Sequence, residues 1–431
     1  MGELALLLMT PSPDRRRRLH LNVNALNAGV FGGSWRHPDH DATSSYSLEH
    51  YLRIARKAEE AKFDGVFLAD GPVIAEDLRY RSANSLEPST VLTAIATRTE
   101  RLGLIGTFSS TYNDPAEIAR RVLSLDLLSG GRVGWNVVTT AGSGAARNFG
   151  FEGEPDHAGR YDRAALVVDI AQRLWDGDDV DGRSLGLPRS PQGRPVIVQA
   201  GGSADGVRLA ARVAEVVFSA AQTLDDALAF AGRVRDGGVG FGRNRSDVTI
   251  LPGLSTVIGS TEREAAERRE LLSELVPEPY ALARLSGQLG FPLEDLDLDA
   301  PVPTDRLVAP EQAGGSQTFY AAVLGLIERE KPTLRQLLRH LGGGAGHRIV
   351  VGTPERVADD IEHWFRSGAA DGFNLMPDVL PSGLDDFADH VVPILQDRGL
   401  FRREYEGETL RSHLGETVDE TVGETALAVN R

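Results

Sequence analysis

The chain of 431 residues contains no cysteine. Disulfide bonds, thiolate metal sites and cysteine nucleophiles are therefore excluded, and a cytoplasmic protein is expected. A long apolar run is also missing, because the segment LALLLM at 4–9 is far shorter than the roughly 20 residues of a membrane span. That segment has no preceding basic region and does not resemble a signal peptide. No membrane partner is expected.

Basic residues are too few for a protein that binds nucleic acid. Lysine and arginine number 46 against 62 acidic residues, which gives a formal net charge of -16. Binding to phosphate backbones needs clustered Lys and Arg, whereas the one basic run, Arg15 to Arg18, is interpreted as a solvated flank. The sequence also has no H-E-x-x-H, no G-x-S-x-G and no Walker lysine. His37 and His40 form an isolated pair, so no metal site is expected.

Short apolar runs alternate with longer amphipathic stretches such as SLEHYLRIARKAEEAK at 47–62. Continuous apolar runs are typical of parallel strands that helices cover on both faces. The pattern predicts an α/β fold, a (β/α)8 TIM barrel with insertions, rather than an open doubly wound sheet. The predicted strands lie at 19–26, 63–70, 102–108, 132–139, 195–200, 214–220, 249–259 and 371–377.

The barrel repeat predicts the domain organisation. We expect a flexible leader at 1–18, one barrel at 19–403 and an acidic C-terminal tail at 404–431 that packs loosely or serves an oligomer contact. Two stretches, at about 176–194 and 278–347, interrupt the repeat. Long insertions in barrels usually lie at the rim of the active site.

Polar residues gather where the predicted strands end, which is where barrel enzymes place their sites. The stretch GGRVGWNVVTT at 130–140 is an example, because an apolar strand carries Trp135 and Asn136 in its middle. Whether Trp135 belongs to the core or to a pocket wall stays open. Neutral hydrogen-bonding groups dominate the set, so a cofactor is expected to perform the chemistry. The set comprises Asn24, Asn27, Asp70, Thr107, Ser109, Asn136, Thr139, Thr140, Gln199, Gly201 to Ser203 and Asn374.

Two segments each allow two interpretations. The turn Gly201-Gly202-Ser203 joins a strand to a helix, so Ser203 is either an ordinary N-cap or part of a phosphate site at the helix N-terminus. His157 and Tyr161 share one face of the first turn of another helix. They are either capping and packing groups or ligand contacts.

Taken as a set, the motifs resemble those of the bacterial luciferase-like FMN-dependent monooxygenases. Within that family the chain is most similar to the branch with nitrilotriacetate monooxygenase, dibenzothiophene-sulfone monooxygenase and pristinamycin synthase A. The matching segments are SWRHP (34–38), KFDGVFLAD (62–70), SLDLLSGGRVGWNVVTT (124–140), AARNFG (145–150), RYDRA (160–164), SPQGRPVIVQAGGS (190–203), VGTPERVAD (351–359), AADGFNLMP (369–377) and VVPILQDRG (391–399).

The resemblance implies a two-component enzyme. A separate NAD(P)H:FMN reductase supplies reduced FMN, O2 is the co-substrate, and a flavin C4a-peroxide inserts one oxygen atom into a small-molecule substrate. A homodimer or homotetramer is expected, and no catalytic residue is assigned. The positions that the resemblance implies for cofactor binding are Asp70, Thr107, Asn136, Thr140, His157, Tyr161, Gly202 and Ser203.

The sequence departs from the family on the substrate side. Where many members have G-H-H-x-G-A-W, this chain has Val30 and Phe31 in place of both histidines. The substrate therefore does not carry over from the named members. Two alternatives stay open: a deazaflavin-dependent oxidoreductase of the same superfamily, and a flavin-binding subunit without catalytic activity.

Overall fold

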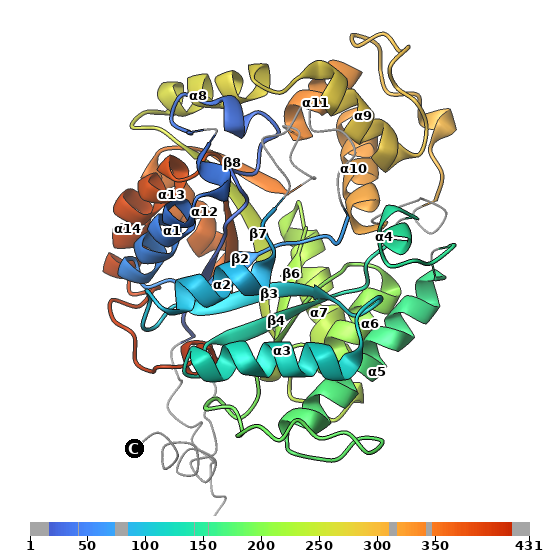
Figure 1. Cartoon of the computed structure of the whole chain (residues 1–431). Coiled ribbons are helices and arrows are strands. Elements are labelled where there is room, and N and C mark those ends of the chain that lie inside the picture. The colour runs from blue at the N-terminus through green and yellow to red at the C-terminus, as the bar shows by residue number, and fades with distance from the viewer. Residues whose placement is uncertain are drawn as a thin grey trace, which may run out of the picture.

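The computed structural model describes residues 17–41, 43–73, 85–141, 143–153, 155–309, 317–341 and 347–415. Its centre is a closed barrel of parallel strands (Figure 1). Strands pair in chain order from β1 to β7, and β9 closes the ring between β7 and β1. All eight predicted strands are present, so the (β/α)8 barrel is confirmed. They are β1 (His20–Asn24), β2 (Gly65–Leu68), β3 (Gly103–Ser109), β4 (Val133–Val138), β5 (Val196–Ala200), β6 (Val216–Ser219), β7 (Thr249–Ile258) and β9 (Gly372–Pro377).

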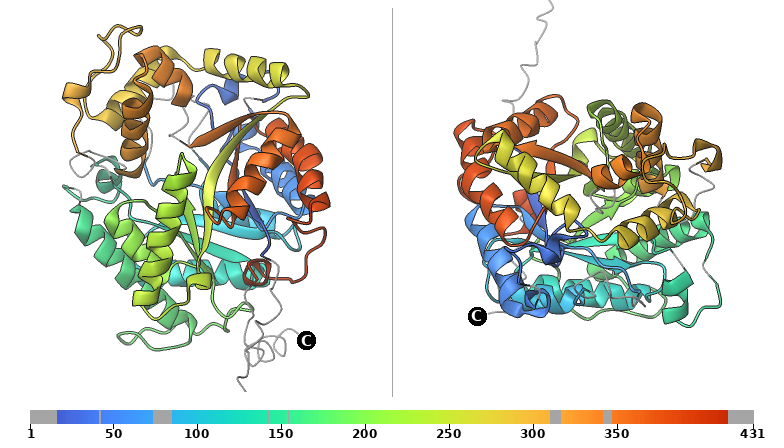
Figure 2. Two further views of the ribbon diagram at one scale, coloured as in Figure 1. Left: turned by 180° about the vertical axis from the view of Figure 1, so that it is seen from behind. Right: turned by 90° about the horizontal axis from the view of Figure 1, so that it is seen from above.

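Helices surround the barrel, as Figure 2 shows from two further sides. Most begin after a Ser, Thr or Asp whose side chain accepts a backbone N–H of the first turn, for example Asp114 before α3 and Thr353 before α12. None of the helices within the described ranges is long and apolar enough to cross a membrane. The surrounding helices are α1 (Leu48–Glu60), α2 (Pro88–Ala96), α3 (Pro115–Leu128), α5 (His157–Trp175), α6 (Ala204–Val213), α7 (Leu224–Gly240), α12 (Pro354–Arg366), α13 (Ser382–Asp386) and α14 (Val392–Asp397).

A further strand, β8 (Arg348–Gly352), was not predicted from the sequence. It pairs with the second half of β7, from Leu254 to Ile258, whereas β6 pairs with the first half, from Thr249 to Pro252. One edge of β7 therefore has two partners in succession. The strand β7 therefore separates from β6 after Pro252, at the carboxyl end of β6.

The stretch predicted as an insertion at 278–347 forms three helices that pack on one another. They follow α8 (Glu262–Glu274) and stand together at the upper right of Figure 1. Residues 310–316 and 342–346 of this stretch lie outside the described residues. The helices are α9 (Glu278–Leu289), α10 (Gln317–Glu330) and α11 (Leu334–Leu341), and their shared apolar cluster includes Leu282, Leu285, Leu289, Tyr320, Val323, Ile327, Leu334 and Leu337. The other predicted interruption, 176–194, contains two tight turns, bridged between Val180 and Arg183 and between Ser190 and Gly193.

The amino-terminal end of the barrel is filled by α15 (Leu410–His413). Leu410 and Leu414 are buried in one cluster with interior side chains such as Ile105. Gly103 leaves the space for this contact, since a Cβ there would lie 2.6 Å from Leu410 Cδ1. Residues 404–415 of the predicted tail are therefore part of the barrel body. Residues 416–431, and residues 1–16 of the predicted leader, lie outside the described residues.

A buried ion pair fastens this end. Asp64, after α1, is fully buried and accepts hydrogen bonds from Arg402, from the Leu21 N–H at 2.7 Å and from His20 Nδ1 at 3.0 Å. Arg402 also donates to the backbone oxygen of His413 at 3.0 Å. Burial by itself raises the pKa of Asp64, but the positive charges and the donors outweigh it and hold the pKa well below its usual range. The ionised carboxylate therefore stabilises the fold above the pKa of unfolded Asp, and this stability is lost as pH falls toward the depressed folded pKa.

We expect Asp64→Asn to lower the free energy of unfolding at pH 7 by about 3–5 kcal/mol, because it leaves the Arg402 guanidinium buried without a charge partner. The matched control is Asp397→Asn, which breaks the exposed pair with the adjacent Arg403 and should cost less than about 1 kcal/mol. Denaturant unfolding measures both. Equal losses would contradict the role given to Asp64.

Candidate functional site

Two predicted site residues meet at the carboxyl end of the barrel. Thr107 on β3 and Asn136 on β4 are paired in register, and Asn136 Nδ2 donates to Thr107 Oγ1 at 2.9 Å. Both side chains are buried, yet Asn136 Oδ1 has no hydrogen-bond partner in the described part of the chain. A buried carbonyl oxygen without a donor costs about 1–3 kcal/mol, so this position suits a ligand that carries an N–H.

The other two predicted barrel-end residues lie just beyond the strands. The hydroxyl of Thr140, two residues after β4, is also buried without a partner among the described residues. Asp70 follows β2 and is half-buried. Burial raises the pKa of Asp70, and the nearby Glu87 carboxylate acts in the same direction against the Gly71 N–H. No described contact joins Asp70 to the other predicted site residues.

The remaining predicted residues come together where two helices begin. His157 is the first residue of α5, and its ring packs edge-on against Tyr161, with centroids 4.9 Å apart. Ser203 is the N-cap of α6, because its Oγ accepts the Gly206 N–H at 3.1 Å. The same oxygen lies 3.4 Å from the hydroxyl of Tyr161. The capping interpretation of Ser203 is thus confirmed, and a phosphate role, which is compatible with it, stays a prediction.

The turn before α6 runs close to α5. A Cβ on Gly201 would lie 3.5 Å from the Tyr161 hydroxyl and 2.8 Å from Gln199 Nε2. Gly202 follows it, between this contact and the N-cap. The N-terminal ends of α5 and α6 therefore lie close together, and the positive ends of helix dipoles favour an anion.

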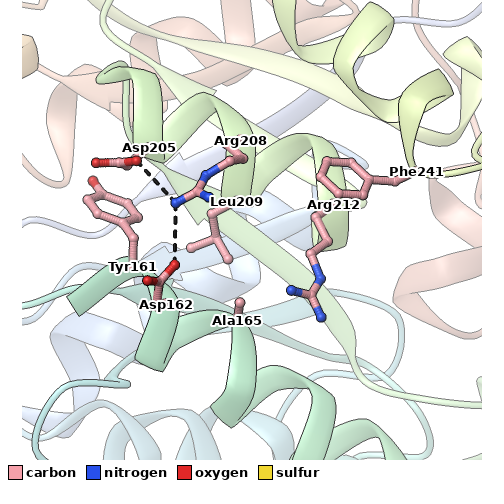
Figure 3. Close-up of a pocket in the computed structure, with 8 residues that line it drawn as sticks. All are labelled: Tyr161, Asp162, Ala165, Asp205, Arg208, Leu209, Arg212 and Phe241. Atoms are coloured by element: carbon pink, nitrogen blue, oxygen red, sulfur yellow. Dashed lines mark hydrogen bonds and ion pairs between the residues drawn. The ribbon is translucent and has the colours of Figure 1, made fainter. Parts of the chain in front are cut away.

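Two carboxylates and one guanidinium lie beside this place. Asp205, in the first turn of α6, lies 3.6 Å from His157 Nε2 and 3.2 Å from the Arg208 guanidinium, which also contacts Asp162 at 3.3 Å (Figure 3). The Arg208 guanidinium offsets part of this negative charge, which would otherwise repel an anion.

The hollow drawn in Figure 3 lies between α5 and α6 and holds about 100 Å³. Sites for drug-sized ligands are typically about 300–1,000 Å³. The hollow is therefore too small to hold a flavin, although Tyr161 and Asp205 line it.

His347 is a site candidate that sequence reasoning missed. It precedes β8 and is buried beside Phe218 of β6, with ring centroids 5.2 Å apart. Gly253, where β7 leaves β6, makes room for it, because a Cβ there would lie 2.6 Å from His347 Nδ1. Burial, helped by the positive charge of Arg284, lowers the pKa of His347 to about 4. The imidazole is neutral at pH 7 and can donate or accept a hydrogen bond.

The contacts of Trp135 show whether it lies in the core or in a pocket wall. Its side chain is fully buried, Nε1 donates to the backbone oxygen of Phe108 at 3.1 Å, and the ring packs edge-on against Trp175. Trp135 therefore belongs to the layer between strands and helices, whereas the adjacent Asn136 faces the barrel interior.

The residues that replace the two family histidines serve packing. Phe31 is buried with Val257, Leu272 and Val379, and Val30 packs against the same cluster. The Arg269 guanidinium lies 4.8 Å above the Phe31 ring. This segment therefore packs between α8 and the barrel strand β7.

The two other histidines that the sequence singled out also have structural partners. His40 Nδ1 contacts the backbone oxygen of Leu380 at 2.9 Å, and His37 Nδ1 lies 3.5 Å from the Asp39 carboxylate. Across the described ranges, no group of three or more His, Asp or Glu residues could hold a metal ion.

Comparison with known proteins gives a consistent match. A family model described as "Luciferase-like monooxygenase" matches residues 30–371. Nitrilotriacetate monooxygenase component A of Aminobacter aminovorans is 41% identical, over 90% of this chain and 94% of that protein. The A component of pristinamycin IIA synthase from Streptomyces pristinaespiralis is also 41% identical, over 93% and 96%. Both belong to the branch that the motifs predicted, so that prediction is confirmed.

Solved structures agree with this match. EDTA monooxygenase from Chelativorans sp. BNC1 is 31% identical, with a TM-score of 0.76 over 93% of this chain and 99% of that chain. A riboflavin lyase solved with modified FMN is 28% identical, with a TM-score of 0.81 over 93% and 96%. An F420-dependent reductase from Methanopyrus kandleri also matches, but 15% identity and a TM-score of 0.55 show a shared fold alone.

The fit of His347 against Gly253 generates a prediction. Gly253→Ala should lower the free energy of unfolding by about 1–3 kcal/mol, because the new methyl group overlaps the imidazole and the Phe218 ring. The control is Gly232→Ala in α7, where a Cβ meets no atom within 4 Å and the helix should gain about 0.5–1 kcal/mol. Denaturant unfolding compares them. A neutral Gly253→Ala would mean that His347 does not fill this space.

Proposed function

Because this chain belongs to the luciferase-like monooxygenase family, we propose that it uses reduced FMN and O2 to insert one oxygen atom into a small organic substrate. The enzyme is a monooxygenase, as its relatives from the matching branch are. The proposal adds the identity of the flavin, the residues that bind it and the source of its electrons.

One arrangement carries the choice of FMN. The N-termini of α5 and α6 meet at Tyr161 and Ser203, and the partner-free amide oxygen of Asn136 lies at the carboxyl end of the same barrel. FMN combines a terminal phosphate with a ring edge that has an N–H donor between two carbonyl oxygens. The helix N-termini suit the phosphate, and Asn136 suits the N–H donor.

The predicted residues then divide into two groups by task. His157, Tyr161, Ser203 and the backbone of Gly202 hold the phosphate, while Asn136, positioned by its hydrogen bond to Thr107, orients the ring. The complete set adds Asp70 and Thr140 beside the ring.

When bound, reduced FMN supplies the electrons that activate O2 and delivers one oxygen atom to the substrate. The protein contributes orientation and the exclusion of water. Phe67 and Phe218, whose ring centroids are 6.1 Å apart across the barrel, provide apolar surroundings for that step.

Reduced flavin is supplied to the barrel by a second protein. A transient NAD(P)H:FMN reductase is the proposed partner, which fits the name "component A" of the nitrilotriacetate relative. The enzyme then acts where NAD(P)H is available, in the cytoplasm, and we expect a homodimer or homotetramer.

The phosphate assignment predicts the effect of two substitutions. Ser203→Ala and Tyr161→Phe should each weaken FMN binding about tenfold, because each removes a hydroxyl at the paired helix N-termini. Flavin fluorescence titration measures the dissociation constant. The control is Thr223→Ala, which removes the equivalent N-cap of the next helix, α7. Thr223→Ala should lower the free energy of unfolding by about 1 kcal/mol and leave FMN binding unchanged. Unchanged titrations in both site variants would refute the assignment.

The activity itself is tested with 18O2. Full-length protein, FMN, a flavin reductase and NADH are incubated with sulfones, amines, lactams and polycarboxylates, and product masses are recorded. We expect at least one product to gain a single 18O atom. Tight FMN binding without any oxygenated product would favour the subunit that has lost activity, and turnover only with reduced F420 would favour the deazaflavin alternative.

A further inference from the structure

Helix α9 has two different faces. At 100° per residue, its Leu282, Leu285 and Leu289 point to one side, where they are buried in the insertion cluster. Tyr280 and Arg284, one turn apart, point to the opposite side. This second face has no part in the apolar core of the insertion.

Contacts show what the second face meets. A Cβ on Gly32 would lie 2.7 Å from Tyr280 Cε1, so the tyrosine ring rests on the loop that follows β1. Arg284 Nη1 donates to the Tyr280 hydroxyl at 2.9 Å, which fixes the guanidinium beside that loop. Because the loop after β1 is at the carboxyl end of the barrel, Arg284 is held at the end where Asn136 and His347 lie. Further along the same face, a Cβ on Gly287 would meet no atom within 4 Å.

Arg284 has no acidic partner among the described residues. It is half-buried, and no carboxylate pairs with it in the described part of the chain. Two other arginines of the insertion are paired with acids, Arg335 with Asp299 at 2.8 Å and Arg339 with Glu270 at 3.1 Å. The positive charge of Arg284 also reaches His347, where it opposes protonation of the imidazole. A partly desolvated cation is costly unless an anion joins it.

We propose that Arg284, positioned by Tyr280, binds a carboxylate group of the substrate, with the neutral imidazole of His347 on the side of the barrel. The proposal rests on the monooxygenase function described above and adds the chemical class of the substrate. A planar guanidinium with one nitrogen engaged by Tyr280 keeps N–H groups free for a two-point contact with a planar carboxylate.

Equilibrium binding tests the proposal without turnover. Ligand-observed NMR on the full chain with FMN compares nitrilotriacetate, glutarate and benzoate with their neutral amides. Wild-type protein should bind at least one carboxylate tenfold or more tightly than its amide. Arg284→Gln should remove that difference, and Arg284→Lys should keep part of it because the charge remains.

The control variant is Arg306→Gln, which removes an exposed arginine of the same insertion whose ring contact is with Phe291. It should leave the carboxylate preference unchanged. Circular dichroism confirms that the variants are folded. The proposal is overturned if wild type shows no preference for any carboxylate, or if Arg284→Gln retains the preference in full.

FMN titrations separate this proposal from the general function. Arg284→Gln should bind FMN as wild type does, and a loss of FMN affinity would assign Arg284 to the cofactor and overturn the substrate role. Failure of wild type to bind FMN or to incorporate 18O would refute the monooxygenase proposal instead, through measurements that do not involve Arg284.

Discussion

A closed barrel of parallel strands directs every carboxyl end to the same side of the molecule, and the rest of the structure follows from that constraint. The opposite end can be closed, and here the apolar side chains of α15 and the buried Asp64–Arg402 pair close it. The carboxyl end carries buried polar atoms that lack partners among the described residues, such as Asn136 Oδ1. Stability and ligand binding are thus assigned to different ends of one barrel.

Much of the fold could be predicted because the barrel strands are short and largely apolar, as in GVFL of β2 and VIVQA of β5. The strand β8 was missed because its apolar part, Ile349 to Val351, is too short to stand out from the predicted insertion that precedes it. The role of α15 was missed for a different reason. Its Leu410 looks like part of an acidic tail in sequence, and the space that it fills is left by Gly103 and Gly134 on two distant strands.

Local sequence patterns likewise reveal only part of the candidate site. Asn136, Tyr161 and Ser203 stand out in sequence because motifs and strand ends mark them. His347 and Arg284 carry no such mark, since each depends on a neighbour far away in the chain, Gly253 for the imidazole and Gly32 for the Tyr280 that holds the guanidinium. The proposed flavin contacts thus come from the repeating barrel units, and the proposed substrate contact comes from an insertion whose packing local sequence patterns do not reveal.

The two successive partners of β7 have a consequence for how such enzymes diversify. The chain leaves the barrel after Ile258 and returns at Arg348, and β8 lies against the same stretch of β7 from which the chain departed. The segment from α8 to α11 therefore begins and ends at one pair of adjacent strands, β7 and β8. Because both ends of the segment lie side by side, it can be lengthened, shortened or exchanged without a change in the register of the eight barrel strands. Such an exchange would replace the helix that carries Tyr280 and Arg284 and would leave Asn136 and Ser203 in place on the barrel.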